Sequence, residues 1–108
     1  MNPDWYSHQN VAEVPSPSLL VYPERITENV RRMIAMASGA ARLRPHMKTH
    51  KMPELIRLQL ALGVTKFKCA TIAETEMTAG AGAPDVLLAY QPVGPNVARV
   101  LALTQNFP

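Results

Sequence analysis

The fold of the chain is indicated most clearly by the stretch Lys66-Phe67-Lys68-Cys69-Ala70-Thr71. Its residue types predict a β-strand, and Thr71 with Glu74 three residues later forms a capping-box pattern, which satisfies unpaired backbone N–H groups at the start of a helix. We expect that helix to end near Gly80 or Gly82, because glycine readily adopts the backbone conformation that follows a helix. The stretch therefore predicts a strand that leads directly into a helix.

The same strand–helix order is predicted on both sides of this unit. Residues 43–48 form a short extended segment followed by a helix over residues 53–62, and residues 85–90 form a strand followed by a helix that begins at Pro95. The strand at 85–90 is apolar almost throughout, which is typical of strands covered on both faces. Such alternation with short loops favours an α/β fold with right-handed crossovers and a parallel sheet. Either a small open sheet or part of a (β/α)8 barrel fits, and a complete barrel needs roughly 250 residues.

The N-terminal part of the chain precedes these units. We expect an irregular arm over residues 1–16 and a partial domain over residues 17–108. Residues 18–22 are a short apolar run bounded by prolines, which predicts a buried strand. A helix is predicted from Pro23 to a stop at Gly39, with one apolar stripe made of Ile26, Val30, Met33, Ile34 and Ala37.

Length and composition indicate one small globular domain. The chain has 108 residues, 47% of them hydrophobic and 18% charged, with a net charge of +3 that does not require a nucleic-acid partner. Its single cysteine, Cys69, excludes an intrachain disulfide and favours a reducing, cytoplasmic setting. We expect no signal peptide and no membrane span, because no apolar run approaches the ~20 residues that a spanning helix needs. Cys69 itself is expected to be a small buried residue in a strand.

Reactive side chains are concentrated in the stretch Arg44-Pro45-His46-Met47-Lys48-Thr49-His50-Lys51. In an extended backbone, alternation places Arg44, His46 and Lys48 on one face. A lysine amine attacks carbonyl groups well only when its pKa is lowered, and neighbouring cations lower it. The pattern is therefore compatible with a Schiff base between Lys48 and an aldehyde such as pyridoxal phosphate. Thr71 and Tyr90 end the next two strands, where functional groups of α/β proteins gather.

The residues alone also allow other interpretations of this basic stretch. Composition favours a solvated loop, or a passive site for a phosphate, over a Schiff-base lysine. His46 and His50 would suit a metal if they lay on a helix, and the extended backbone expected here argues against that. A basic module that binds anions or RNA receives little support, because aromatic residues are not interleaved with the basic ones.

The stretch 44–51 resembles the pyridoxal-phosphate lysine motif of the D-threonine aldolase and D-serine dehydratase family. The resemblance covers roughly residues 15–104. Beyond the motif it is carried by residues 16–21, Pro53-Glu54, residues 57–60, Cys69-Ala70-Thr71 with Glu74, residues 87–90 and Val93-Gly94. It implies the N-terminal portion of an alanine-racemase-type (β/α)8 barrel, whose first strand ends at Lys48.

The family resemblance also implies roles for individual residues. Lys48 would be the catalytic Schiff-base lysine, Lys51 a supporting or surface charge, and the strand at 18–22 part of a C-terminal β domain. Apart from the resemblance, we expect further cofactor contacts from His46 and Arg44, which share the strand face of Lys48, and from Thr71 and Tyr90 at the next strand ends. Most of the phosphate site and the ligands of a divalent metal (Mn or Zn) would lie outside this chain, which would be a fragment of a full-length enzyme that is a homodimer.

The function implied by the resemblance is that of a pyridoxal-phosphate-dependent lyase acting on D-configured β-hydroxy amino acids. A D-threonine aldolase-like cleavage to glycine and an aldehyde is preferred. The alternatives are a D-serine dehydratase-like ammonia-lyase and a non-catalytic carrier of pyridoxal phosphate. The expected partner is a small D-amino acid, and neither a nucleic acid nor a membrane.

Overall fold

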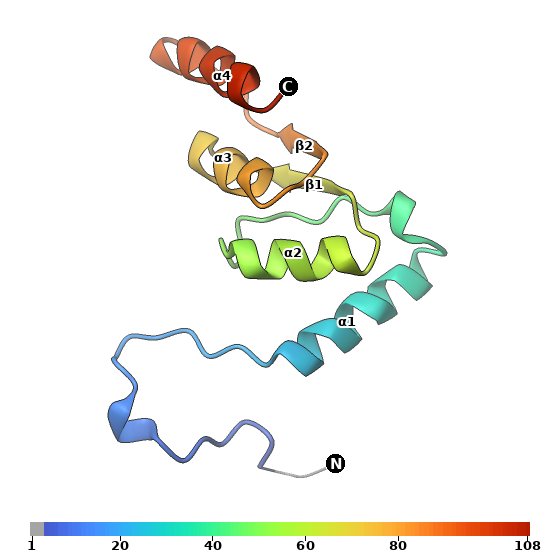
Figure 1. The fold of residues 1–108 in the computed structure, drawn as a ribbon, viewed down its shortest axis with the longest axis vertical. Helices are drawn as coiled ribbons and strands as arrows, with labels where there is room; N and C mark the ends of the chain where they lie inside the picture. The colour runs from blue at the N-terminus through green and yellow to red at the C-terminus, as the bar shows by residue number, and fades with distance from the viewer. Residues whose placement is uncertain (1–3) are drawn as a thin grey trace.

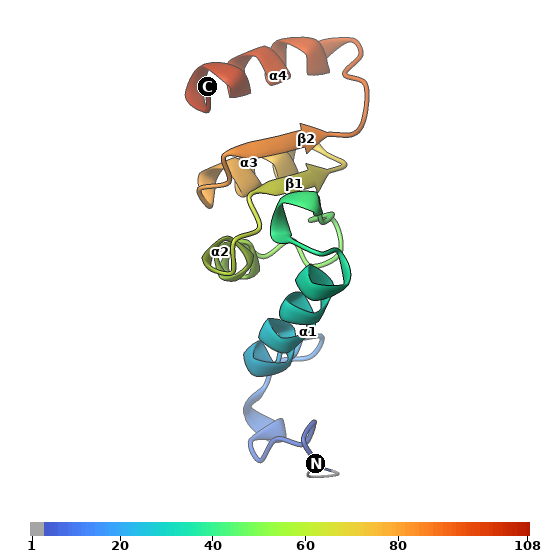
Figure 2. The ribbon, with the colours of Figure 1, turned by 90° about the vertical axis from the view of Figure 1, so that its right-hand side faces the viewer.

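The computed structural model describes residues 4–108, in which helices and short strands follow one another along the long axis (Figures 1 and 2). The irregular arm lies at one end and the last helix at the other. In chain order the elements are η1 (Val11–Glu13), α1 (Pro23–Met36), η2 (Ala40–Arg42), α2 (Pro53–Ala61), β1 (Lys66–Cys69), α3 (Ile72–Gly80), β2 (Asp85–Leu88) and α4 (Pro95–Asn106), η denoting a 3-10 helix. Each of the four predicted α-helices is confirmed. Within the described part of the chain, none of the helices combines the length and the apolar character needed to cross a bilayer.

The sheet consists of β1 and β2, which pair in parallel from Lys66 opposite Asp85 to Cys69 opposite Leu88. α3 connects the two strands and contacts both. A parallel pair joined through a helix confirms the predicted α/β class. The barrel and the domain boundaries stay predictions. Both strands are two residues shorter than expected, and β1 stops at Cys69 because Thr71 already serves as the cap of α3.

The segment before Lys48 lies along the other side of β1, where it makes a single bridge between His46 and Lys68. The Lys68 N–H donates to the Pro45 carbonyl at 2.9 Å, and the Met47 N–H donates to the Lys68 carbonyl at 2.8 Å. Pro45 has no N–H to contribute to further pairing. The prediction of a short and irregular extended segment is therefore confirmed.

The core gathers around β1 and the segment before Lys48. Its fully or nearly buried apolar members are Val30, Met47, Ile56, Val64, Phe67 and Cys69. Phe67 and Cys69 alternate with the less buried Lys66 and Lys68 on β1, as expected for a strand with one face toward a core. The prediction that Cys69 is buried is confirmed. Because Met47 is only 1% exposed, this core also fixes the backbone immediately before Lys48.

The prediction of a buried strand at residues 18–22 is wrong. These residues lie in the open segment before α1, where Leu19 is 69% exposed and Leu20 is 46% exposed. A strand forms only when a neighbouring backbone accepts and donates its hydrogen bonds. No other part of residues 4–108 supplies such a neighbour to this run.

The expectation that β2 is covered on both faces is also wrong. Its side chains alternate, with Asp85 and Leu87 exposed and with Val86 and Leu88 partly buried. Leu87 is 47% exposed because α3 covers one face of the pair and the described residues bring no second layer to the other. Apolar composition alone did not reveal this difference between the two faces.

The arm is tied to the start of α1 by its aromatic residues. The Trp5 ring meets the Tyr22 ring edge to face at 5.1 Å, and the Arg25 guanidinium lies 3.5 Å from the centre of the Trp5 ring. The Tyr22 hydroxyl donates to the Tyr6 carbonyl at 2.6 Å. These contacts lie far along the chain from the segment that carries Lys48 (Figure 1).

Candidate functional site

Lys48 lies in a tight turn that starts where the segment leaves β1. Met47 begins this turn with a buried side chain and with its N–H bonded to the Lys68 carbonyl. The Lys51 N–H donates to the Met47 carbonyl at 3.1 Å and closes the turn. Lys48 and Thr49 between these two points are exposed. The fold therefore presents Lys48 on an anchored turn and not on a strand face.

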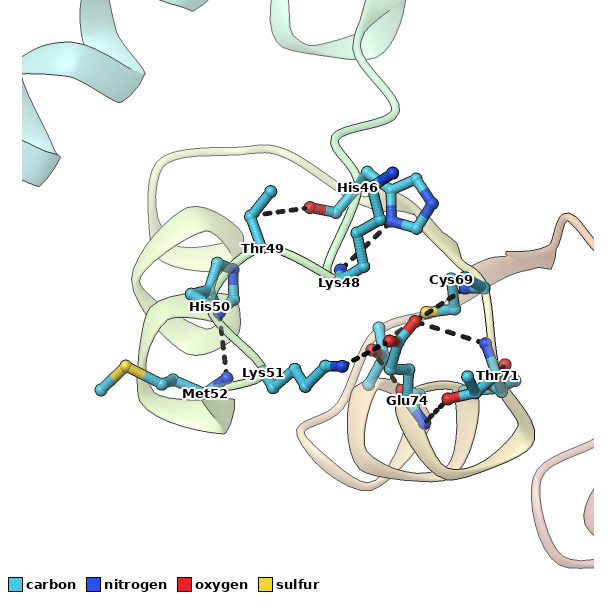
Figure 3. Close-up of polar contacts among 12 residues, drawn as sticks. His46, Lys48, Thr49, His50, Lys51, Met52, Cys69, Thr71 and Glu74 are labelled. Carbon is cyan, nitrogen blue, oxygen red and sulfur yellow. Dashed lines mark hydrogen bonds and ion pairs between the residues drawn. The ribbon is translucent and has the colours of Figure 1, made fainter. Parts of the chain in front are cut away.

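Two histidine rings fasten the backbone on either side of this turn (Figure 3). The Lys48 N–H donates to His46 Nδ1 at 3.1 Å, and the Met52 N–H donates to His50 Nδ1 at 2.9 Å. A ring nitrogen that accepts an N–H carries no proton, so the bond from Met52 requires a neutral His50 ring. Burial lowers the pKa of His50 below its ordinary value, which favours the neutral ring. Its Nε2 is buried and has no hydrogen-bond partner among residues 4–108.

The far end of the turn is joined to α3 through Lys51 and Glu74. Lys51 Nζ lies 3.2 Å from Glu74 Oε1, and the Glu74 side chain is only 4% exposed (Figure 3). Glu74 Oε2 accepts the N–H groups of Ala70 at 2.7 Å and of Thr71 at 3.3 Å. The Glu74 N–H donates to Thr71 Oγ1 at 3.1 Å, which confirms the predicted capping box.

The Glu74 carboxylate stays charged although it is buried. Burial by itself raises the pKa of Glu74, but the Ala70 N–H and the Lys51 ammonium outweigh it and hold the pKa below its ordinary value. Both carboxylate oxygens therefore act as acceptors, one toward the lysine and one toward the backbone that follows β1.

The two lysines of the motif are in different electrostatic environments. Lys51 Nζ is engaged by Glu74, whereas Lys48 Nζ makes no hydrogen bond or ion pair with any residue of the described chain. An amine that serves as a nucleophile must be unengaged and accessible. Of these two lysines, Lys48 meets that requirement.

Arg44 is directed away from this turn. Its guanidinium binds Asp85 with two bonds, Nη1 to Oδ1 at 2.7 Å and Nη2 to Oδ2 at 2.9 Å, and Nη1 also donates to the Phe67 carbonyl at 3.1 Å. The hydrogen bond to Arg44 lowers the pKa of Asp85, and the same bond raises the pKa of Arg44. Asp85 begins β2, so Arg44 joins the segment before Lys48 to the start of the sheet. The structure does not bring its charge to the Lys48 amine.

Thr71 and Tyr90 line one open hollow at the carboxyl ends of β1 and β2. Its volume is about 440 Å³, and α4 contributes Asn96 and Arg99 to the lining. Arg99 Nη1 donates to Asn96 Oδ1 at 3.2 Å, so its guanidinium is held near the first turn of α4. The sequence did not single out Asn96 and Arg99, although their place in the helix that follows the last predicted strand was a signal. Lys48 and His46 do not line this hollow.

No group of three or more potential metal ligands from His, Cys, Asp and Glu exists among residues 4–108. His46 and His50 each use Nδ1 to accept a backbone N–H, so those two nitrogens are not available to a metal. The expectation of a divalent metal bound elsewhere in the enzyme stays a prediction.

The chain is similar to two curated enzymes. It is 37% identical to a D-threonine aldolase of Arthrobacter sp over 86 residues. This match covers 79% of this chain and 23% of the relative. It is 30% identical to a D-threo-3-hydroxyaspartate dehydratase of Delftia sp. (strain HT23) over 92 residues. This match covers 84% of this chain and 24% of the relative. These similarities confirm the resemblance inferred from the lysine motif and the expectation of an enzyme family.

The chain spans about a quarter of the length of these curated relatives. No family model matches it, and no solved structure matches it.

Proposed function

We propose that this chain forms the lysine-bearing part of a pyridoxal-phosphate-dependent lyase that acts on D-configured β-hydroxy amino acids. Support comes from the motif around Lys48 and from the similarity to an aldolase and a dehydratase whose names both specify D-amino acids bearing a β-hydroxyl group. Lys48 is the proposed attachment point of the cofactor. The proposal extends to a small-molecule substrate and to a homodimer of the complete enzyme.

The observation that carries this proposal is the contrast between the two lysines of the motif. Lys51 is paired with a buried carboxylate, whereas the Lys48 amine is exposed and without a partner in the described residues. The turn around Lys48 is anchored on both sides, so its amine projects from a fixed backbone. Preorganisation of this kind lowers the cost of bringing a reactive group to its target.

The residues present fit the cofactor in several respects. Lys48 supplies a free amine for covalent attachment, and the hollow at the neighbouring strand ends offers hydroxyl groups from Thr71 and Tyr90 and a cation from Arg99. When bound, pyridoxal phosphate withdraws electrons from the bonds at the α-carbon of an amino acid. The chain's contribution is to hold the amine on an anchored turn and to provide polar groups at the ends of the strands.

Aldol cleavage is the preferred reaction, because the aldolase is the relative with the higher identity. It would release glycine and an aldehyde from a D-β-hydroxy amino acid. Dehydration is the second candidate and is supported by the similarity to the dehydratase. A carrier of pyridoxal phosphate would attach the cofactor at the same lysine and convert neither substrate.

The attachment is tested by incubating the protein with pyridoxal phosphate, reducing it with borohydride and locating the added mass by peptide mass spectrometry. We expect the added mass on Lys48 and its loss in Lys48→Met. Lys68 is the informative internal comparison, because its amine also has no partner among the described residues. Added mass on Lys51 or Lys68 in place of Lys48, or none at all, would contradict the proposal.

The reaction is tested separately by supplying D-threonine and D-threo-3-hydroxyaspartate to the protein loaded with the cofactor. Release of glycine supports the aldolase, release of ammonia with an oxo acid supports the dehydratase, and release of neither supports the carrier. A basic module that binds anions or RNA would instead show binding that weakens steeply with salt.

A further inference from the structure

We propose that Lys51 and Glu74 are positioning residues that hold the Lys48 turn against the start of α3. We call this ion pair the Lys51–Glu74 clamp. The inference rests on the proposed function, because it takes Lys48 as the attachment point of pyridoxal phosphate. It assigns to Lys51 the task of fixing where the Lys48 amine stands relative to the strand ends.

Besides the two histidine–backbone bonds, two contacts attach this short turn to its neighbours β1 and α3, and the clamp is the second of them. The first is Met47, whose buried side chain and N–H bond to Lys68 attach the turn to β1. The second is Lys51, whose ammonium reaches Glu74 at 3.2 Å while its N–H closes the turn on the Met47 carbonyl. Lys48 lies between these two anchors in the sequence, so we expect the loss of the clamp to loosen the backbone that carries it.

Lys51 has a backbone conformation that residues with side chains rarely adopt, and its side chain makes the ion pair with Glu74. Its φ is 52°, in the left-handed region that glycine adopts far more readily than residues with side chains. A glycine here would suit the turn and would have no group to reach Glu74. The strained backbone and the ion pair thus occur in the same residue, which is consistent with a side chain that holds the turn in place.

Glu74 connects this anchor to the predicted cofactor residue Thr71. Oε1 faces Lys51, while Oε2 binds the N–H groups of Ala70 and Thr71 directly after β1. A buried carboxylate is stable only when its oxygens are paired, so removing the lysine leaves Oε1 without its cation. One side chain therefore fixes both the turn that carries Lys48 and the strand end that carries Thr71.

The experiment compares Lys51→Met, Lys51→Arg, Glu74→Gln and the Lys51→Met/Glu74→Gln double variant. The amide introduced by Glu74→Gln retains an oxygen for the Ala70 N–H and lacks the charge that attracts Lys51. Lys66→Met is the matched control, because it removes one positive charge at the far end of β1, where Lys66 donates to the Ala41 carbonyl. Two readouts are used: the rate at which pyridoxal phosphate labels Lys48, and amide hydrogen exchange at Lys48 and Lys51 without cofactor.

We expect Lys51→Met to slow labelling of Lys48 by about threefold to fivefold and to accelerate the two amide exchanges by a similar factor, as befits a partly exposed ion pair. Lys51→Arg should restore both readouts, and Lys66→Met should leave them unchanged. Glu74→Gln should match Lys51→Met, and the double variant should be no worse than either single one, because both remove the same interaction.

The outcomes separate this inference from the proposed function. If Lys48 is labelled equally fast in the wild type and in Lys51→Met, and the amide exchange is equal too, the clamp is overturned and the attachment stands. If the wild type is never labelled at Lys48, the attachment is overturned, and amide exchange alone decides whether the clamp holds the turn. If Lys51→Met does not fold, Glu74→Gln and Lys51→Arg supply the same comparison.

Discussion

His50 is a titratable residue whose neutral form is built into the turn that carries Lys48. Its Nδ1 accepts the Met52 N–H at 2.9 Å, and burial lowers its pKa from 6.5. The folded protein therefore binds fewer protons at this ring than the unfolded chain does. Stability from this ring is complete above the unfolded pKa of 6.5 and is lost as the pH falls from there toward the lowered folded pKa.

Replacing His50 by Asn is expected to remove this part of the pH dependence. An Asn side chain can also accept the N–H two residues later and does not titrate, so stability at neutral pH should change by less than about 1 kcal/mol. The measurement is the free energy of urea unfolding between about pH 7.5 and 5.5. His8→Asn makes the same substitution in the arm, away from the Lys48 turn, and is the matched control. An equal pH slope in His50→Asn and wild type would refute the assigned role.

Some side-chain contacts of the site could be predicted from the sequence, and others could not. The Thr71 and Glu74 pairing was predictable, because a capping box involves residues three apart on one helix start. The ion pair of Lys51 with Glu74 was not, because it joins distant residues and depends on a left-handed backbone at Lys51. Arg44 was expected beside Lys48 from alternation, and its partner Asp85 became evident only from the register of β1 and β2.

Among the elements, α3 has the most complete N-terminal cap. Thr71 Oγ1 accepts a hydrogen bond from the Glu74 N–H, and the Glu74 carboxylate accepts one from the Thr71 N–H. This cap also sets the position at which β1 ends and the hollow near Tyr90 begins. Its contribution to stability is thus separable from any contact of Thr71 with a cofactor.

Thr71→Ala is expected to destabilise the protein by about 1 kcal/mol, because the Glu74 backbone N–H loses its hydrogen-bond acceptor. Thr71→Ser keeps a hydroxyl in the same place and should recover most of that loss. Both variants are compared by urea unfolding at neutral pH, with far-UV circular dichroism to follow helix content. A serine variant as unstable as the alanine variant would mean that the hydroxyl is not acting as a cap.

Helices were predictable where their signals were local, and strands were not where they needed a distant partner. Proline in the first turn marks the starts of α1, α2 and α4 in the sequence and in the structure alike. The run at residues 18–22 has the composition of a strand, but the described chain offers it no neighbour. Segment 43–48 pairs only at His46, since Pro45 cannot extend the ladder.

On the scale of the whole molecule, the chain is extended for its size. Its radius of gyration is 16.5 Å, whereas a compact domain of this length has about 13 Å. The core cluster consists of a few buried apolar residues, while large apolar side chains on β2 and α4 remain exposed, among them Leu87 and Leu101. The parallel pairing of β1 and β2 could be predicted from the alternation of strands and helices in the sequence. The sequence pattern of a strand does not tell how much of each face of the sheet other elements cover.

The exposed face of β2 predicts association of the protein with itself. Among residues 4–108, β2 pairs with β1 alone, and Leu87 on its open face is 47% exposed. Unpaired strand edges and exposed apolar side chains favour contacts between copies. We therefore expect sedimentation velocity to show a mass that increases with protein concentration and that decreases in Leu87→Lys, because a charge on this face opposes its burial.

Leu19→Lys is the matched control for this association. Leu19 is 69% exposed in the segment before α1, so the same substitution changes charge and hydrophobicity by the same amount at a site outside the sheet. Leu19→Lys should retain the concentration dependence of the wild type, because repulsion by one added charge is not specific to β2. If both variants reduce association to the same extent, net charge and not the face of β2 controls it, and the open strand is then not the site of contact.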